Sequence, residues 1–145
     1  MTRFEIVNPE ELGRPSGFSH GILAPAGGQV LFVAGQTAPE AGGGDADGVG
    51  PAEGRLVAQF AAALGRALAV VRDAGGRPEH VVRLTVYVTD MAAYRAARSQ
   101  LGDAWRATMG RHYPAIALVE VRSLVNPDAV VEIEATAVLP EKTPR

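Results

Sequence analysis

The sequence predicts an α+β domain in which two helices cover one face of a β-sheet. Three observations support this fold class: several stretches alternate apolar and polar residues, two longer stretches repeat apolar residues at helical spacing, and the order along the chain is ββαβαββ. Two helices suffice to cover only one face of a sheet. We therefore expect residues 1–145 to form a single two-layer domain with one sheet face that no helix covers.

The first strands are expected near the N-terminus. Residues 4–7 form a short strand pattern, and residues 18–24 and 29–34 form a hairpin pattern around the turn Pro-Ala-Gly-Gly. Residues 37–54 are rich in Gly, Pro and Asp without an apolar period, which predicts a loop. Its glycine run at residues 42–44 lacks the lysine of a phosphate-binding loop, so a flexible lid and a plain linker both stay open.

Two helices are expected in the middle of the chain. Apolar residues recur at three- and four-residue spacing from Leu56 to Val71, and Gly-Gly follows as a C-cap signal. Asp90 is placed to cap a second helix whose apolar stripe runs from Tyr94 to Met109 and ends at Gly110. Each helix has one apolar side for a sheet.

The remaining strands are residues 82–89, 115–122 and 130–138, with a polar break at 125–128 between the last two. On the last strand Val131, Ile133, Ala135 and Ala137 share one side, which we assign to the core. The uncovered face is expected to carry Arg83, Thr85, Tyr87, Ile116, Leu118, Glu120, Arg122, Glu132 and Glu134. Ile116, Leu118 and Tyr87 favour another subunit over water as the neighbour of that face.

Composition excludes several functional classes. The chain has no cysteine, so it has neither a disulfide framework nor a thiolate nucleophile, and three histidines far apart in sequence predict no metal site. The formal net charge of −2 does not suit nucleic-acid binding. The start lacks a signal peptide's apolar core, and the longest apolar run is interrupted by Gly65 and Arg66. We therefore expect a cytoplasmic protein that does not span a membrane.

Five stretches resemble the RidA/YjgF family, also described as endoribonuclease L-PSP-like: PSGFSHG, LFVAGQTAP, VVRLTVYVTDMAAY, YPAIALVEV and VEIEATAV. They cover the chain from about Ser16 to Leu139 in the family's order. The resemblance implies a chorismate-mutase-like fold and a homotrimer with a small-molecule cleft at each subunit interface. It also implies hydrolysis of reactive enamines and imines to 2-oxo acids and ammonia, without a cofactor.

The chain departs from the family at the residues that grip the substrate. Active members carry an arginine directly after Pro-Ala of the fourth quoted stretch, where this chain has Ile116, and arginine suits a bidentate carboxylate contact. A family tyrosine is matched by Phe18, a serine by Ala34 and an asparagine by Arg98. The resemblance therefore predicts a divergent member that does not act on 2-aminoacrylate-type imines. Arg83, Arg98 and Arg122 stay open as replacements for the missing cation.

Glu132 is the candidate catalytic residue, because it aligns with the glutamate thought to position or activate water in the family. The other reading is a structural carboxylate on the sheet face. Glu120 and Glu134 are expected to be structural or solvated. The substrate-binding candidates are Phe18, His20, Ala34, Gly35, Gln36, Arg98, Ile116 and Leu118.

His20 lies where active members often carry glutamine, and an ordinary hydrogen-bonded histidine is the alternative. His80 and His112 are expected at the surface, and Trp105 is expected to pack in the core. Three functions remain: a deaminase-like hydrolase of a small, less polar, non-carboxylate imine or related electrophile, a non-catalytic metabolite-binding trimer, and, less favoured by the acidic composition, an endoribonuclease or translation inhibitor.

Overall fold

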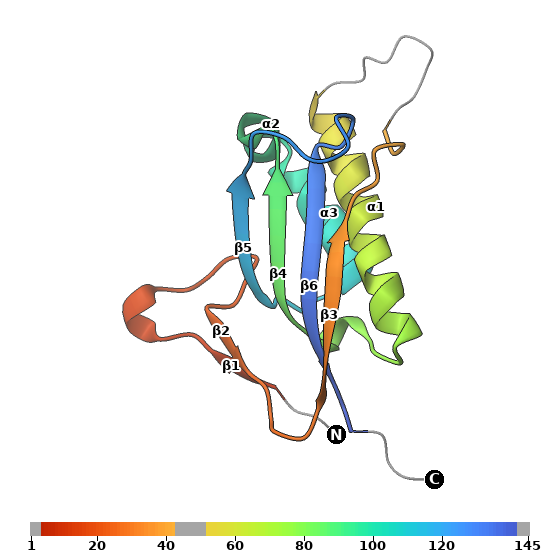
Figure 1. The fold of residues 1–145 in the computed structure, drawn as a ribbon. Helices are drawn as coiled ribbons and strands as arrows, with labels where there is room; N and C mark the ends of the chain where they lie inside the picture. Colours follow the sequence, from red (N-terminus) through yellow and green to blue (C-terminus); the bar gives the residue numbers. More distant parts are fainter. Residues whose placement is uncertain (1–3, 43–51, 142–145) are drawn as a thin grey trace.

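The computed structural model describes residues 4–42 and 52–141 (Figure 1). Its main sheet has four strands in the order β3-β6-β4-β5, where β4 and β5 are parallel and the other neighbours are antiparallel. The strands are β3 (Gln29–Gln36), β4 (Val81–Val88), β5 (Ala115–Glu120) and β6 (Val131–Leu139). β6 is thus an inner strand, flanked by β3 and β4.

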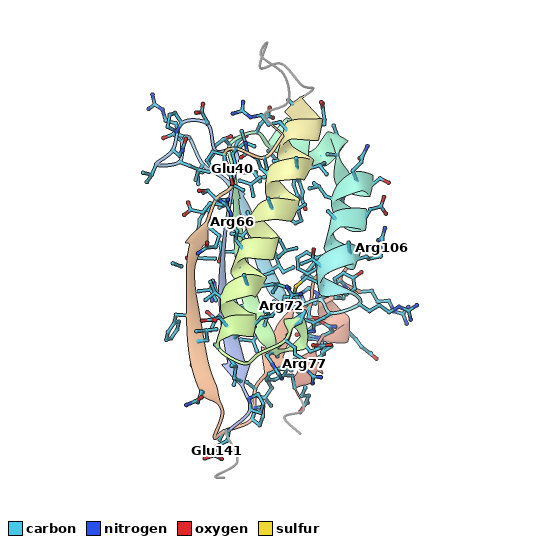
Figure 2. All side chains as sticks on the ribbon, turned by 90° about the vertical axis from the view of Figure 1, so that its right-hand side faces the viewer. Glu40, Arg66, Arg72, Arg77, Arg106 and Glu141 are labelled. Carbon is cyan, nitrogen blue, oxygen red and sulfur yellow. The ribbon has the colours of Figure 1, made fainter. Side chains whose placement is uncertain are left out.

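Helices cover one face of this sheet, as predicted. The long α1 (Ala52–Asp73) packs on β6 and β3, and α3 (Arg98–Met109) lies beside α1 (Figure 2). The core between the layers contains Leu64 and Leu68 of α1, Leu84 of β4 and Ile133 of β6, each at most 1% exposed. The α+β two-layer architecture predicted from the sequence is therefore confirmed.

The apolar stripe of α1 is used by this core. Among the described residues, α1 is the one helix long and apolar enough to cross a membrane by length and composition alone. Eight of its residues are buried, among them Phe60, Leu64 and Val71. Packing against the sheet accounts for its apolar character.

The second predicted helix is divided in two. Asp90 caps it as expected, since its Oδ1 accepts a hydrogen bond from the Ala93 N–H at 2.9 Å. α2 (Met91–Ala96) ends at the fully buried Ala97, and α3 starts at the next residue. α3 ends at Gly110, whose φ of 62° is a left-handed conformation that favours glycine. Arg98 is thus the first residue of α3.

The predicted hairpin between residues 18–24 and 29–34 is wrong. β2 (Gly21–Leu23) pairs instead with β1 (Glu5–Val7), and the two form a separate small sheet below the main one (Figure 1). β3 pairs with β6, more than 90 residues later in the chain. A short 3-10 helix, η1 (Glu10–Leu12), lies between β1 and β2.

The open sheet face differs from the prediction on β5. In the β4–β5 register Ile116 lies opposite Leu84 and Leu118 opposite Val86, and both partners are core residues on the helix side. Ile116 and Leu118 therefore face the helices, because cross-strand partners project to the same side of a sheet. Their assignment to the open face is wrong, and so is that of Glu120, which lies opposite the core residue Val88.

The open face is nevertheless partly apolar. Arg83, Thr85 and Tyr87 of β4 pair with Thr136, Glu134 and Glu132 of β6, so all six lie on it as expected. Its apolar part comes from other residues: Phe32 is 79% exposed, Val30 55% and Val119 43%. Such an exposed apolar surface beside charged residues is typical of an interaction face.

The predicted loop at residues 37–54 is described only in part. Residues 39–42 form turns, residues 43–51 with most of the glycine run lie outside the described residues, and α1 already begins at Ala52. Arg66 of α1 pairs with Glu40 and donates to the Thr37 carbonyl, which ties the described part of the loop to the helix (Figure 2). The lid hypothesis for this segment stays a prediction.

His80 is buried, contrary to the prediction that it lies at the surface. It closes the 3-10 helix η2 (Pro78–His80), is 8% exposed, and its Nδ1 accepts a hydrogen bond from the Arg77 N–H at 2.9 Å. Burial, followed by the nearby positive charge of Arg77, lowers the pKa of His80 below its ordinary value of 6.5. Protonating Nδ1 would also remove the acceptor of the Arg77 bond.

This buried imidazole predicts an acid-dependent loss of stability. Because the unfolded state binds a proton more readily than the folded state, the free energy of unfolding should fall as the pH drops below 6.5, the ordinary pKa of histidine. The substitution His80→Asn keeps an acceptor and does not titrate, so its stability should fall less over that range. Urea unfolding at a series of pH values measures both slopes, and equal slopes would refute the assignment.

Candidate functional site

The predicted site residues form two groups on opposite sides of the sheet. Phe18, Arg98, Ile116 and Leu118 line a cavity of about 450 Å³ between α3, β5 and the segment before β2, which we call the helix-side cavity. Ala34, Gly35, Gln36 and Glu132 lie together at the ends of β3 and β6.

The segment carrying Phe18 is fastened to the edge of β5. The Ser19 hydroxyl donates to the Tyr113 carbonyl at 2.6 Å, and the Ser19 N–H donates to the Pro114 carbonyl at 3.0 Å. Neighbouring residues of an extended chain project to opposite sides, so Ser19 is turned to the strand and Phe18 to the cavity. Phe18 thus forms a wall of the cavity.

His20 lies behind this wall and does not line the cavity. Its Nε2 is 3.3 Å from the Gly13 carbonyl oxygen, and its backbone N–H donates to Asn8 Oδ1 at 2.8 Å. Its ring stands edge-on to the Phe18 ring, with centroids 5.2 Å apart and planes at 86°. These contacts fit the hydrogen-bonded histidine of the alternative reading, with a supporting role for Phe18.

α2, α3 and the residues before β5 contribute cavity residues that the sequence reading did not assign. Trp105 stacks on Tyr113, with centroids 6.0 Å apart and planes at 7°, and its indole N–H donates to the His112 carbonyl at 3.1 Å. Tyr94 also lines the cavity, and burial raises the pKa of its phenol while the charge of Arg98 opposes that rise. Both Tyr94 and Trp105 belong to the predicted apolar stripe. Their aromatic side chains are the sequence feature from which a role in lining a cavity could have been predicted.

Glu132 lies against Gly35, and this contact defines the second group, which we call the Gly35–Glu132 corner. A Cβ atom at Gly35 would lie 2.8 Å from Glu132 Cδ, so a larger residue there would displace the carboxyl group. The β3–β6 register shifts between Val33 and Gln36, which places Gly35 in a bulge beside Glu132. Gln36 belongs to the same group, and its Nε2 donates a hydrogen bond to the Ala34 carbonyl at 3.0 Å.

The segment before β6 is held by a buried polar residue. Gln59 of α1 is fully buried, donates to the Asp128 carbonyl at 3.0 Å and accepts from the Val130 N–H at 2.8 Å. A buried amide with both ends bonded holds its partners in one arrangement. Gln59 therefore positions the start of β6 and with it Glu132.

The other candidate carboxylates have structural partners. Glu134 accepts a hydrogen bond from the Tyr87 hydroxyl at 2.8 Å, and this bond is the first cause of the raised pKa of Tyr87. Glu120 accepts from the Met91 N–H at 2.9 Å, at the start of α2. Both contacts agree with the structural roles expected from the sequence.

Of the three arginines considered as replacements for the missing cation, only Arg98 is among the described residues that line the helix-side cavity. Arg83 lies on the open face, where it borders a groove of about 280 Å³ with Phe32, Thr85, Glu134 and Thr136. Arg122 is exposed beyond the end of β5. The described residues contain no group of three or more His, Cys, Asp or Glu side chains suited to a metal.

The helix-side cavity and the Gly35–Glu132 corner cannot meet within one subunit. β4 lies between β5 and β6, so these two strands are separated by about 10 Å at the usual strand spacing. Ile116 and Leu118 also project to the helix side, whereas Glu132 projects to the open face. Within one chain the two groups therefore lie on different sides of the sheet.

A family model and several solved structures all place the chain in the same protein family. A family model described as Endoribonuclease L-PSP matches residues 11–139. The crystal structure of YyfB from Yersinia pestis, described as a protein of unknown function of the conserved Rid protein family, is 33% identical, with 94% of this chain and 98% of that chain covered and a TM-score of 0.69.

Two further solved structures show the same fold at lower identity. The YjgF gene product of E. coli is 27% identical, with 90% of this chain and 92% of that chain covered and a TM-score of 0.58. Rv2704 from Mycobacterium tuberculosis, described as a member of the YjgF/YER057c/UK114 family, is 28% identical, with 94% and 100% covered and a TM-score of 0.60. No curated protein sequence matches the chain significantly.

Proposed function

Because the chain belongs to the endoribonuclease L-PSP family, which includes the Rid and YjgF proteins, we propose that it is a homotrimer that hydrolyses a reactive imine or enamine. The reaction takes place in clefts between subunits. The helix-side cavity of one subunit binds the substrate, and Glu132 of the neighbouring subunit activates the water that attacks it. The reaction consumes water, needs no cofactor and takes place in the cytoplasm.

The observation that carries this proposal is the separation of the two groups of site residues by the sheet. Each subunit has a cavity without a carboxylate among its described lining residues, and a half-buried carboxylate outside that cavity. Neither half performs hydrolysis alone, whereas two subunits supply both halves. The exposed Phe32, Val30 and Val119 on the open face give the subunits a surface for association.

Glu132 is suited to act as a general base. Its carboxylate accepts a proton from water as the water oxygen adds to the imine carbon, and it returns that proton to the nitrogen as the C=N double bond becomes a single bond. A second proton passes from the new hydroxyl group to the nitrogen. The carbinolamine then loses its nitrogen as ammonia while a carbonyl forms, so one water is consumed for each ammonia released. Gly35 supports this role because the absence of a side chain there leaves room for the carboxyl group.

Short 2-aminoacrylate-type imines are not the expected substrates. Ile116 places an aliphatic side chain in the cavity where the family's arginine would grip the carboxylate, and a carboxylate without a partner there costs several kcal/mol, about 3–5 for a buried ion pair with one member removed. Phe18 and Ala34 also lack the hydroxyl groups of their family counterparts. The substrate should be larger and more apolar, and a carboxylate on it needs another lining cation, Arg98, in place of the arginine that Ile116 replaces.

A substitution at Glu132 tests the proposal. Imines generated by an amino acid oxidase from leucine or phenylalanine, and trapped with semicarbazide, should disappear faster with the wild-type protein present. Glu132→Gln should lower this rate by about 100-fold or more, the usual contribution of a general base. Glu134→Gln is a matched control, because Glu134 is on the same face of the same strand but is bonded to Tyr87, and it should keep most of the rate.

Two results would contradict the assignment. Equal rates for Glu132→Gln and the wild type would show that Glu132 is not the base. No acceleration by the wild type for any apolar imine would remove the hydrolase function and favour a non-catalytic metabolite-binding trimer. That alternative is supported by the loss of polar groups at Phe18, Ala34 and Ile116.

RNA cleavage, which the family description names, receives less support from the described residues. Histidines are the usual acid–base pair for such chemistry, but the ring nitrogens of His20, His80 and His112 contact backbone groups of Gly13, Arg77 and Val81. The net charge of −2 also means that the chain has no excess of basic residues to bind the phosphates of RNA.

A further inference from the structure

The helix-side cavity collects most of the aromatic residues of the chain. Phe18, Phe60, Tyr94, Trp105 and Tyr113 line it, which is five of the eight aromatic residues in the sequence. Its volume of about 450 Å³ lies within the usual range for small-molecule sites, roughly 300–1,000 Å³. Flat apolar walls of this kind favour a ring over a short aliphatic chain, because rings stack or pack edge-on against aromatic side chains.

Two arginines occupy one side of the same cavity. Arg98 and Arg106 lie eight residues apart on α3, with Gly102 midway between them, and all three line the cavity. Positions four residues apart lie above one another on a helix, at a rise of about 6 Å. The three residues therefore form a continuous stripe along α3, which we call the arginine stripe.

Gly102 lies directly beside the Arg106 side chain. A Cβ atom at Gly102 would lie 3.3 Å from Arg106 Nη1 and 3.8 Å from Arg106 Cζ, so the Arg106 guanidinium extends over Gly102 toward Arg98. Glycine inside a helix costs about 1 kcal/mol relative to alanine. A gap for the guanidinium accounts for this residue in the middle of α3.

The charge at the cavity is positive. None of the described residues that line it is Asp or Glu. Arg106 also contacts Asp103 at 2.5 Å in an exposed pair, which is weakened by solvent, and the salt bridges of the described residues include none to Arg98. Both arginines are exposed as well as lining the cavity, so they lie at its mouth.

We propose that the helix-side cavity binds an aromatic carboxylate, with the ring among the aromatic side chains and the carboxylate at Arg98 and Arg106. The arginine stripe thus supplies from α3 the cation that Ile116 does not supply from β5. As a statement about substrate, this inference rests on the proposed function: the imine would be an aryl-substituted 2-imino acid. As a statement about binding, it does not depend on catalysis.

Binding of phenylacetate tests the proposal, because its neutral analogue phenylacetamide has nearly the same shape. Trp105 is the only tryptophan of the chain and lines the cavity, so its fluorescence reports occupancy, and calorimetry gives the dissociation constant independently. The variants are Arg98→Gln and Arg106→Gln, and the matched control is Arg95→Gln, an exposed arginine on α2 that is not among the lining residues.

The wild type should bind phenylacetate about tenfold or more tightly than phenylacetamide, as expected for a hydrogen bond to a charged group. Arg98→Gln and Arg106→Gln should each weaken phenylacetate binding by about the same factor and leave phenylacetamide binding unchanged. Arg95→Gln should match the wild type. Equal affinity for the two ligands, no binding of phenylacetate, or an equal loss in Arg95→Gln would overturn the inference.

The two proposals fail separately. Arginine-dependent binding without any imine hydrolysis by the wild type would refute the hydrolase and uphold the carboxylate site. Conversely, hydrolysis of the phenylalanine-derived imine by Arg98→Gln and Arg106→Gln with the KM of the wild type would uphold the hydrolase and refute the carboxylate site.

Discussion

Replacing Phe32 with glutamate is expected to convert the proposed trimer, of about three times 15.1 kDa, into a monomer. Phe32 is 79% exposed on the open sheet face, beside Thr136 in the β3–β6 register. An aromatic residue so exposed contributes to association only if a partner covers it. A glutamate buried there would lose its hydration without gaining a partner, at a cost of several kcal/mol. Light scattering after size exclusion measures the mass directly.

The control for this substitution is Val125→Glu. Val125 is fully exposed in the segment between β5 and β6, so the change adds the same charge to another exposed apolar residue away from the open face. Val125→Glu should leave the mass unchanged. A wild-type protein that already runs as a monomer, or a Phe32→Glu variant that stays trimeric, would show that the open face does not mediate association.

The strands of the sheet could be predicted from the sequence, but the side to which β5 projects could not. The last strand, β6, alternates apolar residues with Glu132, Glu134 and Thr136, so its core side is unambiguous and was predicted correctly. β5 has apolar residues on both sides, because small alanines alternate with Ile116 and Leu118. Only its register with β4 decides the orientation, and that pairing depends on tertiary packing.

The pairing of β3 was missed for a related reason. A Gly-rich turn between residues 23 and 29 is a hairpin signal, and Gly27 has the left-handed φ of 94° that such turns use. The chain does turn there, but β2 is only three residues long and pairs with β1. The long-range partner β6 offers β3 a continuous inner strand, which no local signal indicates.

The arrangement of the candidate site residues could not be predicted from the sequence. The family resemblance brought Glu132, Gly35 and Phe18 into one expected site, and the sheet places Glu132 and Phe18 on different sides. The arginine stripe was missed because a glycine between two arginines has no distinct pattern in a surface helix. Its meaning depends on which side of α3 borders the cavity, and this is a property of the packed structure.

The separation of the two halves of the site predicts that two inactive variants restore each other. Glu132→Gln lacks the carboxylate but keeps the cavity, whereas Ile116→Trp fills the cavity and keeps the carboxylate. Co-expression with two different tags and purification on both yields trimers that contain both chains. In a cyclic trimer each cleft joins the cavity of one subunit to the corner of the next.

Such mixed trimers should recover about one third of the wild-type rate of imine hydrolysis per trimer, since one cleft in each combines an intact cavity with an intact Glu132, whichever chain is present twice. Each parent alone should be inactive, and Leu118→Trp replaces Ile116→Trp if the latter does not assemble. A site within one subunit would give no recovery, because every chain then carries one defective half. Mixed trimers as inactive as their parents would therefore disprove a shared cleft, even if Glu132→Gln alone abolishes the reaction.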